Sequence, residues 1–273
     1  MRRRLARAGL IGLVLPALLL ALWEGLSRFG AAPPNLLPAP SAVLAALLEL
    51  WRSGDLPGHI EITLFRVVAG FLLGTVVATV LGALTGYSTL WRRILDPLLQ
   101  SLRGIPSMAW IPLFVLWLGI FEASKVTLIA VGAFFPVYLY TMAGIQQVDR
   151  KLVEVARVHG YGGAALVRRV LLPATLPAYF TGLRAGLGLA WMFVMAAEFL
   201  GASEGLGFLI IDGQQTGRPA NIIAAILLFA VFGKLSDMAL AALGRRFVSW
   251  QDSFETAEQK KANAADQTRL QAV

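Results

Sequence analysis

Charged side chains within long apolar segments are the residues of this sequence whose types and positions could do chemistry. Arg103, Arg184 and Lys234 each lie about eight or nine residues inside an apolar run, and Glu198 lies near the end of one. A charge at mid-helix costs about 2.5–3.5 kcal/mol on insertion scales, so such residues are functional suspects by default. Basic groups at this depth are compatible with lining an anion path. They also suit anchoring, in which a long side chain reaches the lipid headgroups.

The neighbours of these charges leave their roles open. Asp237 follows Lys234 by one helical turn and is its expected ion-pair partner. Glu198 fits either a gate residue or a simple charge at the membrane interface. Arg66, near the end of another apolar run, is undecided in the same way.

The composition places these residues in a membrane protein. Apolar residues make up 57% of the 273 residues and charged residues 15%, with a mean hydropathy of +0.69. Soluble proteins carry about 25% charged residues, so the composition argues against a soluble enzyme and against a disordered chain. No cysteine is present, which excludes disulfides, thiolate metal sites and cysteine nucleophiles.

Six segments are apolar enough to span a bilayer as helices, which takes about 20 residues. They are residues 9–26, 62–86, 97–118, 126–146, 176–200 and 221–243. The third is interrupted by Pro97, Pro106 and Pro112, which neighbouring helices can accommodate. Residues 40–51 are too short to span and suit a surface helix capped by Ser41. The sequence therefore predicts an all-α, polytopic membrane protein with six transmembrane helices.

The basic residues orient these spans. With both termini in the cytoplasm, sixteen Lys and Arg residues fall on the inner side, and four fall on the outer side, namely Arg28, Arg52, Lys125 and Arg218. Membrane proteins carry this excess in their inner loops. It accounts for most of the net charge of +8 without nucleic acid. For the first segment a cleaved signal peptide, ending near Gly30-Ala31-Ala32, is a second interpretation.

Two of the spans carry small residues at every fourth position. The stripes are Gly70, Gly74, Ala78, Gly82 and Gly86 in the second span, and Ala178, Gly182, Gly186 and Ala190 in the fifth. Small residues let two helix backbones approach closely within a membrane. The stripes predict close packing, and they are also compatible with helices that slide during a transport cycle.

The longest inner loop, residues 147–175, has the pattern of a docking element. Residues 150–159 suit a short helix that ends at Gly160 in a left-handed cap. A second short helix from Ala164 is expected to stop near Pro173. Ala156 and Gly160 are four residues apart and share a face, so we expect a partner surface to approach closely there.

The 147–175 loop contains a spaced pattern of Glu-x-Ala, three residues, Gly, nine residues and aliphatic-x-Leu-Pro. Its residues are Glu154, Ala156, Gly160, Val170, Leu172 and Pro173. This pattern resembles the cytoplasmic coupling loop in permease subunits of binding-protein-dependent ABC importers. Val155 stands where the family usually has the first alanine of Glu-Ala-Ala. The resemblance implies that Glu154, Ala156, Gly160, Leu172 and Pro173 form the ATPase-coupling loop.

Further motifs across about residues 35–250 are similar to the sulfonate/nitrate/taurine branch of this family. They are residues 102–106, 116–119, 133–136, 182–184, 197–198, 203–207 and 233–237. The last of these, together with Trp250, looks most like the aliphatic sulfonate permeases. The resemblance implies an importer for a small oxyanion, with an aliphatic sulfonate as the first choice.

The resemblance also implies an architecture. Its fold would be the type I ABC importer permease fold in a bacterial inner membrane, with both termini cytoplasmic. Residues 1–60 would hold the N-terminus, the first span and a periplasmic amphipathic segment. The core permease domain would cover residues 61–246, and a disordered cytoplasmic tail would cover residues 247–273.

The partners that the resemblance implies are a second permease subunit, most simply in a homodimer, two ATPase subunits and a periplasmic or lipid-anchored substrate-binding protein. ATP binding would close the ATPase dimer, pull the coupling loops together and favour the outward-facing state. This sequence has no Gly-x4-Gly-Lys-Ser/Thr phosphate loop, since Gly233-Lys234 lacks the upstream glycine. We therefore expect ATP to be hydrolysed on a partner subunit.

No enzyme, catalytic residue, cofactor or metal site is expected. His59 and His159 lie on opposite sides in the predicted topology and cannot share a metal or acid–base site. Alternatives of the same branch are a nitrate, taurine or other small-solute permease. An autonomous secondary transporter or channel is the alternative from a different class. Inverted-repeat carriers usually show two similar halves, and the proline-interrupted third segment has no evident counterpart.

Overall fold

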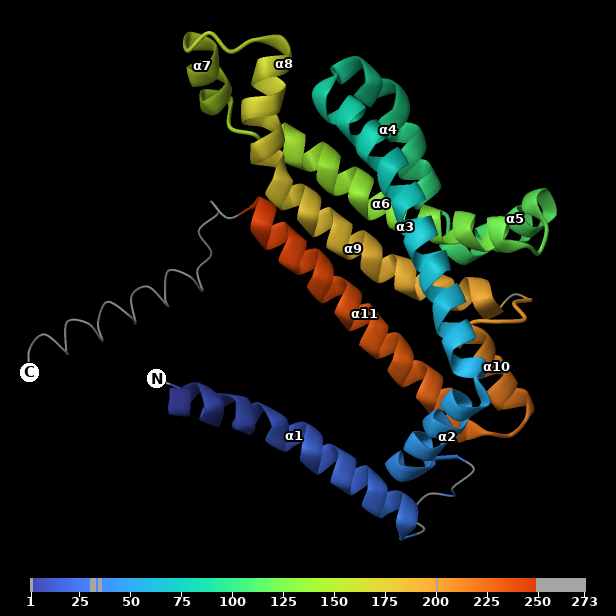
Figure 1. The fold of residues 1–273 in the computed structure, drawn as a ribbon. Coiled ribbons are helices and arrows are strands. Elements are labelled where there is room, and N and C mark those ends of the chain that lie inside the picture. Colours follow the sequence, from blue (N-terminus) through green and yellow to red (C-terminus); the bar gives the residue numbers. More distant parts are fainter. Residues whose placement is uncertain (1, 30–32, 34–35, 200, 249–273) are drawn as a thin grey trace, which may run out of the picture.

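The chain folds around three long helices. The computed structural model describes residues 2–29, 33, 36–199 and 201–248, and this part of the chain is helical without a strand, which confirms the all-α prediction. The central helices are α3 (Asp55–Tyr87), α6 (Glu122–Gln146) and α9 (Leu172–Phe199). A fourth long helix, α11 (Pro219–Phe247), runs along α9 (Figure 1). Most of the predicted tail, including Trp250, lies outside the described residues.

Helix α6 lies between α3 and α9 because both neighbours turn a glycine stripe toward it. A Cβ atom on Gly70 of α3 would lie 2.6 Å from Ile129 Cβ. From the other side, a Cβ atom on Gly182 of α9 would lie 2.6 Å from Tyr140 Cβ. Side chains do not fit at such distances, so the helix backbones themselves are in contact. The packing predicted from the two stripes is confirmed.

The described residues contain four helices that are long and apolar enough to cross a bilayer. They are α3, α6, the run Val167–Phe199 and α11. Helix α1 (Arg2–Arg28), which covers the first predicted span, is not among them. A fifth crossing exists if a bent pair of helices is counted as one. The all-helical membrane fold therefore holds, whereas the count of six spans is not reproduced exactly.

That bent pair replaces the third predicted span. Helix α4 (Thr89–Arg103) ends at Gly104, and a 3₁₀ turn (Ser107–Trp110) leads into α5 (Ile111–Leu118). The two parts meet at an angle of 91°. Pro106 disfavours a helical conformation at the residue before it, which ends the helix at this point. The third predicted span, expected to be interrupted by prolines, is thus broken sharply at Pro106, and it counts as a crossing only if the bent pair is taken as one.

Hydrogen bonds of Ser41, which was expected to cap the helix over residues 40–51, connect α2 (Pro40–Ser53) to α1. Helix α2 begins with Pro40 in its first turn after Ala39, which makes no side-chain cap. Ser41 instead lies inside the helix, so its predicted role as the N-cap is wrong. Its hydroxyl donates to Glu24 Oε1 over 2.8 Å and its backbone N–H to Oε2 over 3.0 Å. The suggested cleavage site at Gly30-Ala31-Ala32 lies outside the described residues.

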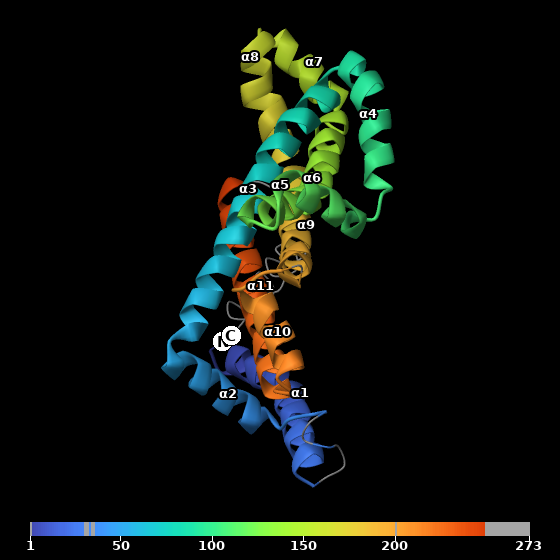
Figure 2. The same ribbon diagram turned by 90° about the vertical axis from the view of Figure 1, so that its right-hand side faces the viewer.

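Four of the shorter helices lie at the two ends of the long ones. Helices α7 (Arg150–Val158) and α8 (Gly163–Leu166) lie at one end, beside the start of α4. Helices α2 and α10 (Leu206–Gln215) lie at the opposite end (Figure 2). We refer to these as the α7 end and the α10 end.

Candidate functional site

The 147–175 loop begins with a helix that is capped at both ends. Asp149 Oδ1 accepts a hydrogen bond from the backbone N–H of Lys151 over 2.8 Å. At the other end, Tyr161 N–H donates to Ala156 O and Gly160 N–H donates to Arg157 O, both over 2.9 Å. With Gly160 at φ +78°, these bonds form a Schellman motif. The left-handed cap predicted at Gly160 is confirmed.

The second half of the loop continues into α9 without a break. Helix α8 passes through a π-helical turn (Val167–Leu171) directly into α9 at Leu172. The prediction that the helix stops near Pro173 is therefore wrong. Proline lacks the N–H that would bond four residues back, and a wider π turn relieves the clash of its ring with the preceding turn. As a result, α8 is attached to α9 by continuous helix.

The predicted docking residues differ in their surroundings. Glu154 is exposed and forms no ion pair with any described residue. Ala156 is only 6% exposed, so it offers a partner little surface of its own beside Gly160. A Cβ atom on Gly160 would meet nothing within 4 Å. Leu172 is exposed and Pro173 is partly buried at the start of α9.

The outward face of α7 is apolar, which the sequence patterns did not single out. Leu152, Val155 and Val158 are all exposed, and Val158 is 86% exposed. Contiguous exposed apolar surface on a protein is typical of a binding site. The period of the apolar residues on this helix is the signal that could have revealed this face.

Glu198, predicted to be either a gate residue or an interface charge, lies in an ion-pair cluster that is buried except at Glu122. We call Thr63, Arg66, Glu122 and Glu198 the Arg66 cluster. The Arg66 guanidinium donates two bonds of 2.7 Å to the two carboxylate oxygens of Glu122, and one of 2.9 Å to Glu198 Oε1. Thr63 donates to the same Glu198 oxygen over 2.7 Å. Because Glu198 is 0% exposed, the interface-charge alternative is wrong.

The cluster also holds the segment that leads into α10. Arg66 Nη1 donates to the backbone carbonyl of Glu204 over 2.7 Å, and Gly207 N–H donates to Glu198 Oε2 over 2.7 Å. Gly205 N–H donates to His59 Nδ1 over 2.9 Å. A Cβ atom on Gly205, whose φ is +125°, would lie 2.5 Å from the Glu198 carboxylate. The 203–207 motif is thus shaped to fit over a buried carboxylate.

The three basic residues predicted to lie within spans fall into different environments. Arg184 of α9 forms a two-pronged ion pair with Asp237 of α11, at 2.7 and 2.8 Å. Asp237 is therefore not the partner of Lys234, which contradicts the predicted pairing within α11. Lys234 is exposed on that helix. Arg103 stands at the C-terminal end of α4 rather than within a continuous span.

Arg103 lines a cavity of about 410 Å³, which we call the Arg103 cavity. The other lining residues come from α6 and α9 and are Gly132, Phe135, Pro136, Leu139, Tyr140, Ala185, Leu189 and Phe193. The structure therefore places one of the predicted path residues, Arg103, in a cavity of ligand size.

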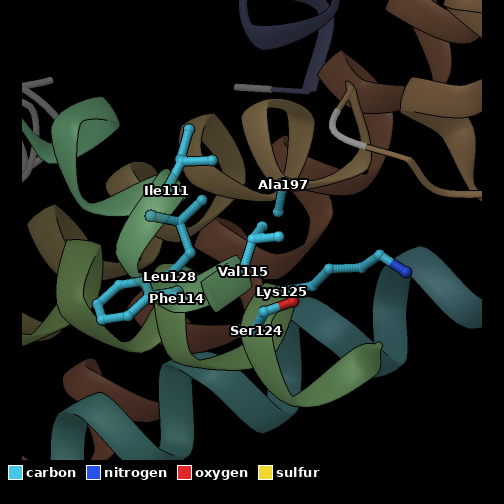
Figure 3. A pocket seen from close by; sticks show the side chains of 7 residues that line it. All are labelled: Ile111, Phe114, Val115, Ser124, Lys125, Leu128 and Ala197. Carbon is cyan, nitrogen blue, oxygen red and sulfur yellow. The ribbon is translucent and has the colours of Figure 1, made fainter. Parts of the chain in front are cut away.

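A second, much smaller cavity of about 20 Å³ lies where α5, α6 and α9 meet (Figure 3). Its walls are mostly apolar, with Ser124 and Lys125 at the edge. The ammonium of Lys125 points away from the cavity and donates to Glu122 Oε1 over 2.9 Å. A space of this size holds about one water molecule, so we assign it to packing.

Most of this sequence matches the model of a known protein family. The family model described as "Binding-protein-dependent transport system inner membrane component" matches residues 62–249. This chain belongs to that family. The match begins near the Arg66 cluster and includes the 147–175 loop, the Arg103 cavity and α11. The protein is thus an inner membrane component of a transport system.

Two relatives place the chain within the sulfonate/taurine/nitrate branch of permeases. It is 43% identical over 244 residues to a protein of Bacillus subtilis named for aliphatic sulfonates transport, the permease SsuC, and the match covers 89% of this chain and 88% of that one. It is 33% identical over 239 residues to the taurine transport system permease protein TauC of Escherichia coli, covering 86% and 87%. These matches confirm the branch that the motifs indicated.

A solved structure supports the fold. The chain aligns with a subunit of an amino acid ABC transporter, crystallised with histidines, at a TM-score of 0.55 and 18% identity. The alignment covers 75% of this chain and 98% of the other. At this identity the likeness supports the permease fold alone.

Proposed function

We propose that this protein forms the translocation pathway of an ABC importer for aliphatic sulfonates. The observation that carries the proposal is the family match over residues 62–249, combined with 43% identity to a relative named for aliphatic sulfonates transport. The nearly complete coverage of both chains favours a shared role for the whole permease.

In this proposal, ATP is hydrolysed on separate ATPase subunits that bind the 147–175 loop. Three features support this role. The loop protrudes at the α7 end, its apolar face carries the exposed Leu152, Val155 and Val158, and Glu154 is available for a basic partner. The continuous helix through the π turn would pass a displacement of the loop on to α9.

The topology follows from the same assignment. The α7 end faces the cytoplasm, where ATPase subunits lie, and the α10 end faces the periplasm, where a substrate-binding protein would dock. Both termini are cytoplasmic, in line with sixteen basic residues on the inner side against four on the outer. A second copy of this chain completes the pathway, as a homodimer.

A capture experiment tests the ATPase contact. The tagged permease, co-expressed with the ATPase subunit of its own importer, should retain that subunit during purification in detergent. Glu154→Arg should lose most of it while the permease still inserts into the membrane. Glu61→Arg, the same charge reversal on an exposed position near the α10 end, is the matched control and should retain it. Full retention by Glu154→Arg would contradict the assigned contact.

Taurine is the second candidate substrate, because the taurine permease TauC of Escherichia coli is similar over 86% of this chain. Nitrate is a further alternative from the same branch. Uptake of labelled pentanesulfonate in the presence of excess taurine or nitrate separates the three. If only longer alkanesulfonates compete, the aliphatic sulfonate assignment is supported. If taurine or nitrate competes equally well, that compound becomes the assigned substrate instead.

A further inference from the structure

The Arg103 cavity combines one cation with an apolar wall. Its lining residues come from the middle of α6 and of α9, and Arg103 is the last residue of α4; these helices are labelled in Figures 1 and 2. Its volume of about 410 Å³ lies within the range of about 300–1,000 Å³ that is typical of small-molecule sites.

The guanidinium of Arg103 has little compensation from the chain. Its one hydrogen bond among the described residues is a long contact of 3.5 Å from Nη1 to Gln100 Oε1, and it forms no ion pair with them. By contrast, Arg66 and Arg184 each face a carboxylate. Arg103 is exposed at the end of α4, so its unpaired donors are accessible to a ligand that enters the cavity, and a guanidinium favours an anionic partner.

The remaining walls of the cavity suit a hydrocarbon chain. Phe135 and Leu139 line it from α6, and Leu189 and Phe193 line it from α9. Phe193 packs directly against Gly132, where a Cβ atom would clash with its ring. No aspartate or glutamate is among the lining residues, so an ammonium group would find no opposite charge there.

A larger cavity nearer the α7 end lacks this combination. It measures about 760 Å³ and lies between α3, α4, α6 and α9. Its lining residues are apolar or uncharged, and Thr79, Tyr87, Trp91 and Tyr179 are among them. An anion would therefore find a charged partner in the Arg103 cavity but not in this larger one.

We propose that the Arg103 cavity is a selectivity site in which the guanidinium holds the sulfonate head of the cargo and the apolar wall holds its alkyl tail. This inference rests on the proposed importer function in one respect, namely that the ligand of the cavity is the transported substrate. The planar donors of arginine match an oxyanion with two parallel hydrogen bonds. Taurine brings an ammonium group that the cavity does not pair, and nitrate has no tail to bury. The permease itself then selects alkanesulfonates, in addition to any selection by a binding protein.

The absence of cysteine from the sequence makes a direct binding test possible. Ala185→Cys introduces one thiol into the exposed part of the cavity wall, in full-length permease held in lipid nanodiscs. A maleimide labels this thiol, and hexanesulfonate at about ten times its dissociation constant should slow the labelling about tenfold. Thr181→Cys, exposed one turn earlier on α9 but outside the lining, should be labelled at an unchanged rate.

Three comparisons decide the proposal. The dissociation constant obtained from protection should fall about fourfold for each methylene added from ethane- to pentanesulfonate, because each methylene group is transferred from water into the apolar cavity. Nitrate and taurine at the same concentration should protect weakly. Arg103→Gln should abolish protection, whereas Arg93→Gln, an exposed arginine at the other end of α4, should retain it. Equal protection by nitrate, or full protection in Arg103→Gln, overturns the proposal.

This readout does not depend on transport. If protection follows the stated pattern but the assembled importer does not take up sulfonates, the proposed function fails and the binding site stands. If sulfonates are taken up but the thiol is protected equally well with Arg103 and with Arg103→Gln, the proposed site is wrong and the proposed function stands.

Discussion

Arg66 donates a hydrogen bond to Glu198 over 2.9 Å, between side chains that are 3% and 0% exposed. This bond joins α3 to α9, and the paired bonds from Arg66 to Glu122 add the start of α6. The three central helices are therefore tied together by charge at the α10 end, while their glycine stripes hold them together along their length.

Removing the buried carboxylate should destabilise the helix bundle strongly. Glu198→Ala leaves Arg66 with one carboxylate and leaves Gly207 N–H without its acceptor. Breaking a buried ion pair costs about 3–5 kcal/mol, so the unfolding temperature in detergent should fall clearly. Glu61→Ala, at an exposed position of the same helix α3, should change the free energy of unfolding by less than about 0.5 kcal/mol. Similar unfolding temperatures for the two variants would contradict the role of the cluster.

The glycine that covers Glu198 should tolerate no side chain. Gly205→Ala places a Cβ atom 2.5 Å from the carboxylate, in addition to the strain of φ +125°. Gly217→Ala is the control, because Gly217 also has a positive φ, +66°, but has open space around it. We expect Gly217→Ala to lower the free energy of unfolding by about 1–2 kcal/mol, from backbone strain alone. Gly205→Ala should lower it clearly more, and thermal unfolding measures both. Equal losses would show that the contact with Glu198 adds nothing.

Gly160 should be required for its backbone conformation rather than for space. Its φ is +78° and a Cβ atom there would meet nothing in this chain, so Gly160→Asn, which tolerates the left-handed region, should keep more ATP-driven uptake than Gly160→Ala. If a docked partner needs the empty space, the larger asparagine should be the more harmful of the two. Gly162→Ala, with open space and no positive φ, is the control and should transport normally.

The close approach of α3 to α6 should fail with one added methyl group. Gly70→Ala would place its Cβ atom 2.6 Å from Ile129 Cβ and 2.9 Å from Val126 O, neither of which lies at the end of a flexible side chain. We expect overpacking to cost about 1–3 kcal/mol and to lower the unfolding temperature. Gly188→Ala, on α9 with no atom within 4 Å, should have no such effect. A normal unfolding temperature for Gly70→Ala would contradict the backbone contact.

The sequence could predict the features that depend on local spacing. The four-residue stripes located the α3–α6 and α6–α9 contacts, because a period of four keeps small residues on one face of a helix. The cap at Gly160 followed in the same way from glycine's access to positive φ. The family motifs then identified the branch, which the relatives confirm.

Features that depend on packing between distant segments were missed. Arg66 and Glu198 lie 132 residues apart, and their equal depth near the ends of two spans was the signal that could have paired them. Asp237 was assigned to Lys234 by helical spacing, but Arg184 on the neighbouring helix reaches it with two hydrogen bonds. Spacing along one helix cannot show which side chain a second helix brings closer.

The central claim is that this chain passes sulfonates across the membrane at the expense of ATP hydrolysed on a partner. Proteoliposomes that hold the permease with its ATPase subunits, and with binding protein and labelled pentanesulfonate on the periplasmic side, test it most directly. We predict accumulation that requires ATP and stops when the ATPase is inactivated by substitution of its phosphate-loop lysine. Accumulation that continues without ATP hydrolysis, and follows an ion gradient instead, would contradict the account and indicate an autonomous transporter.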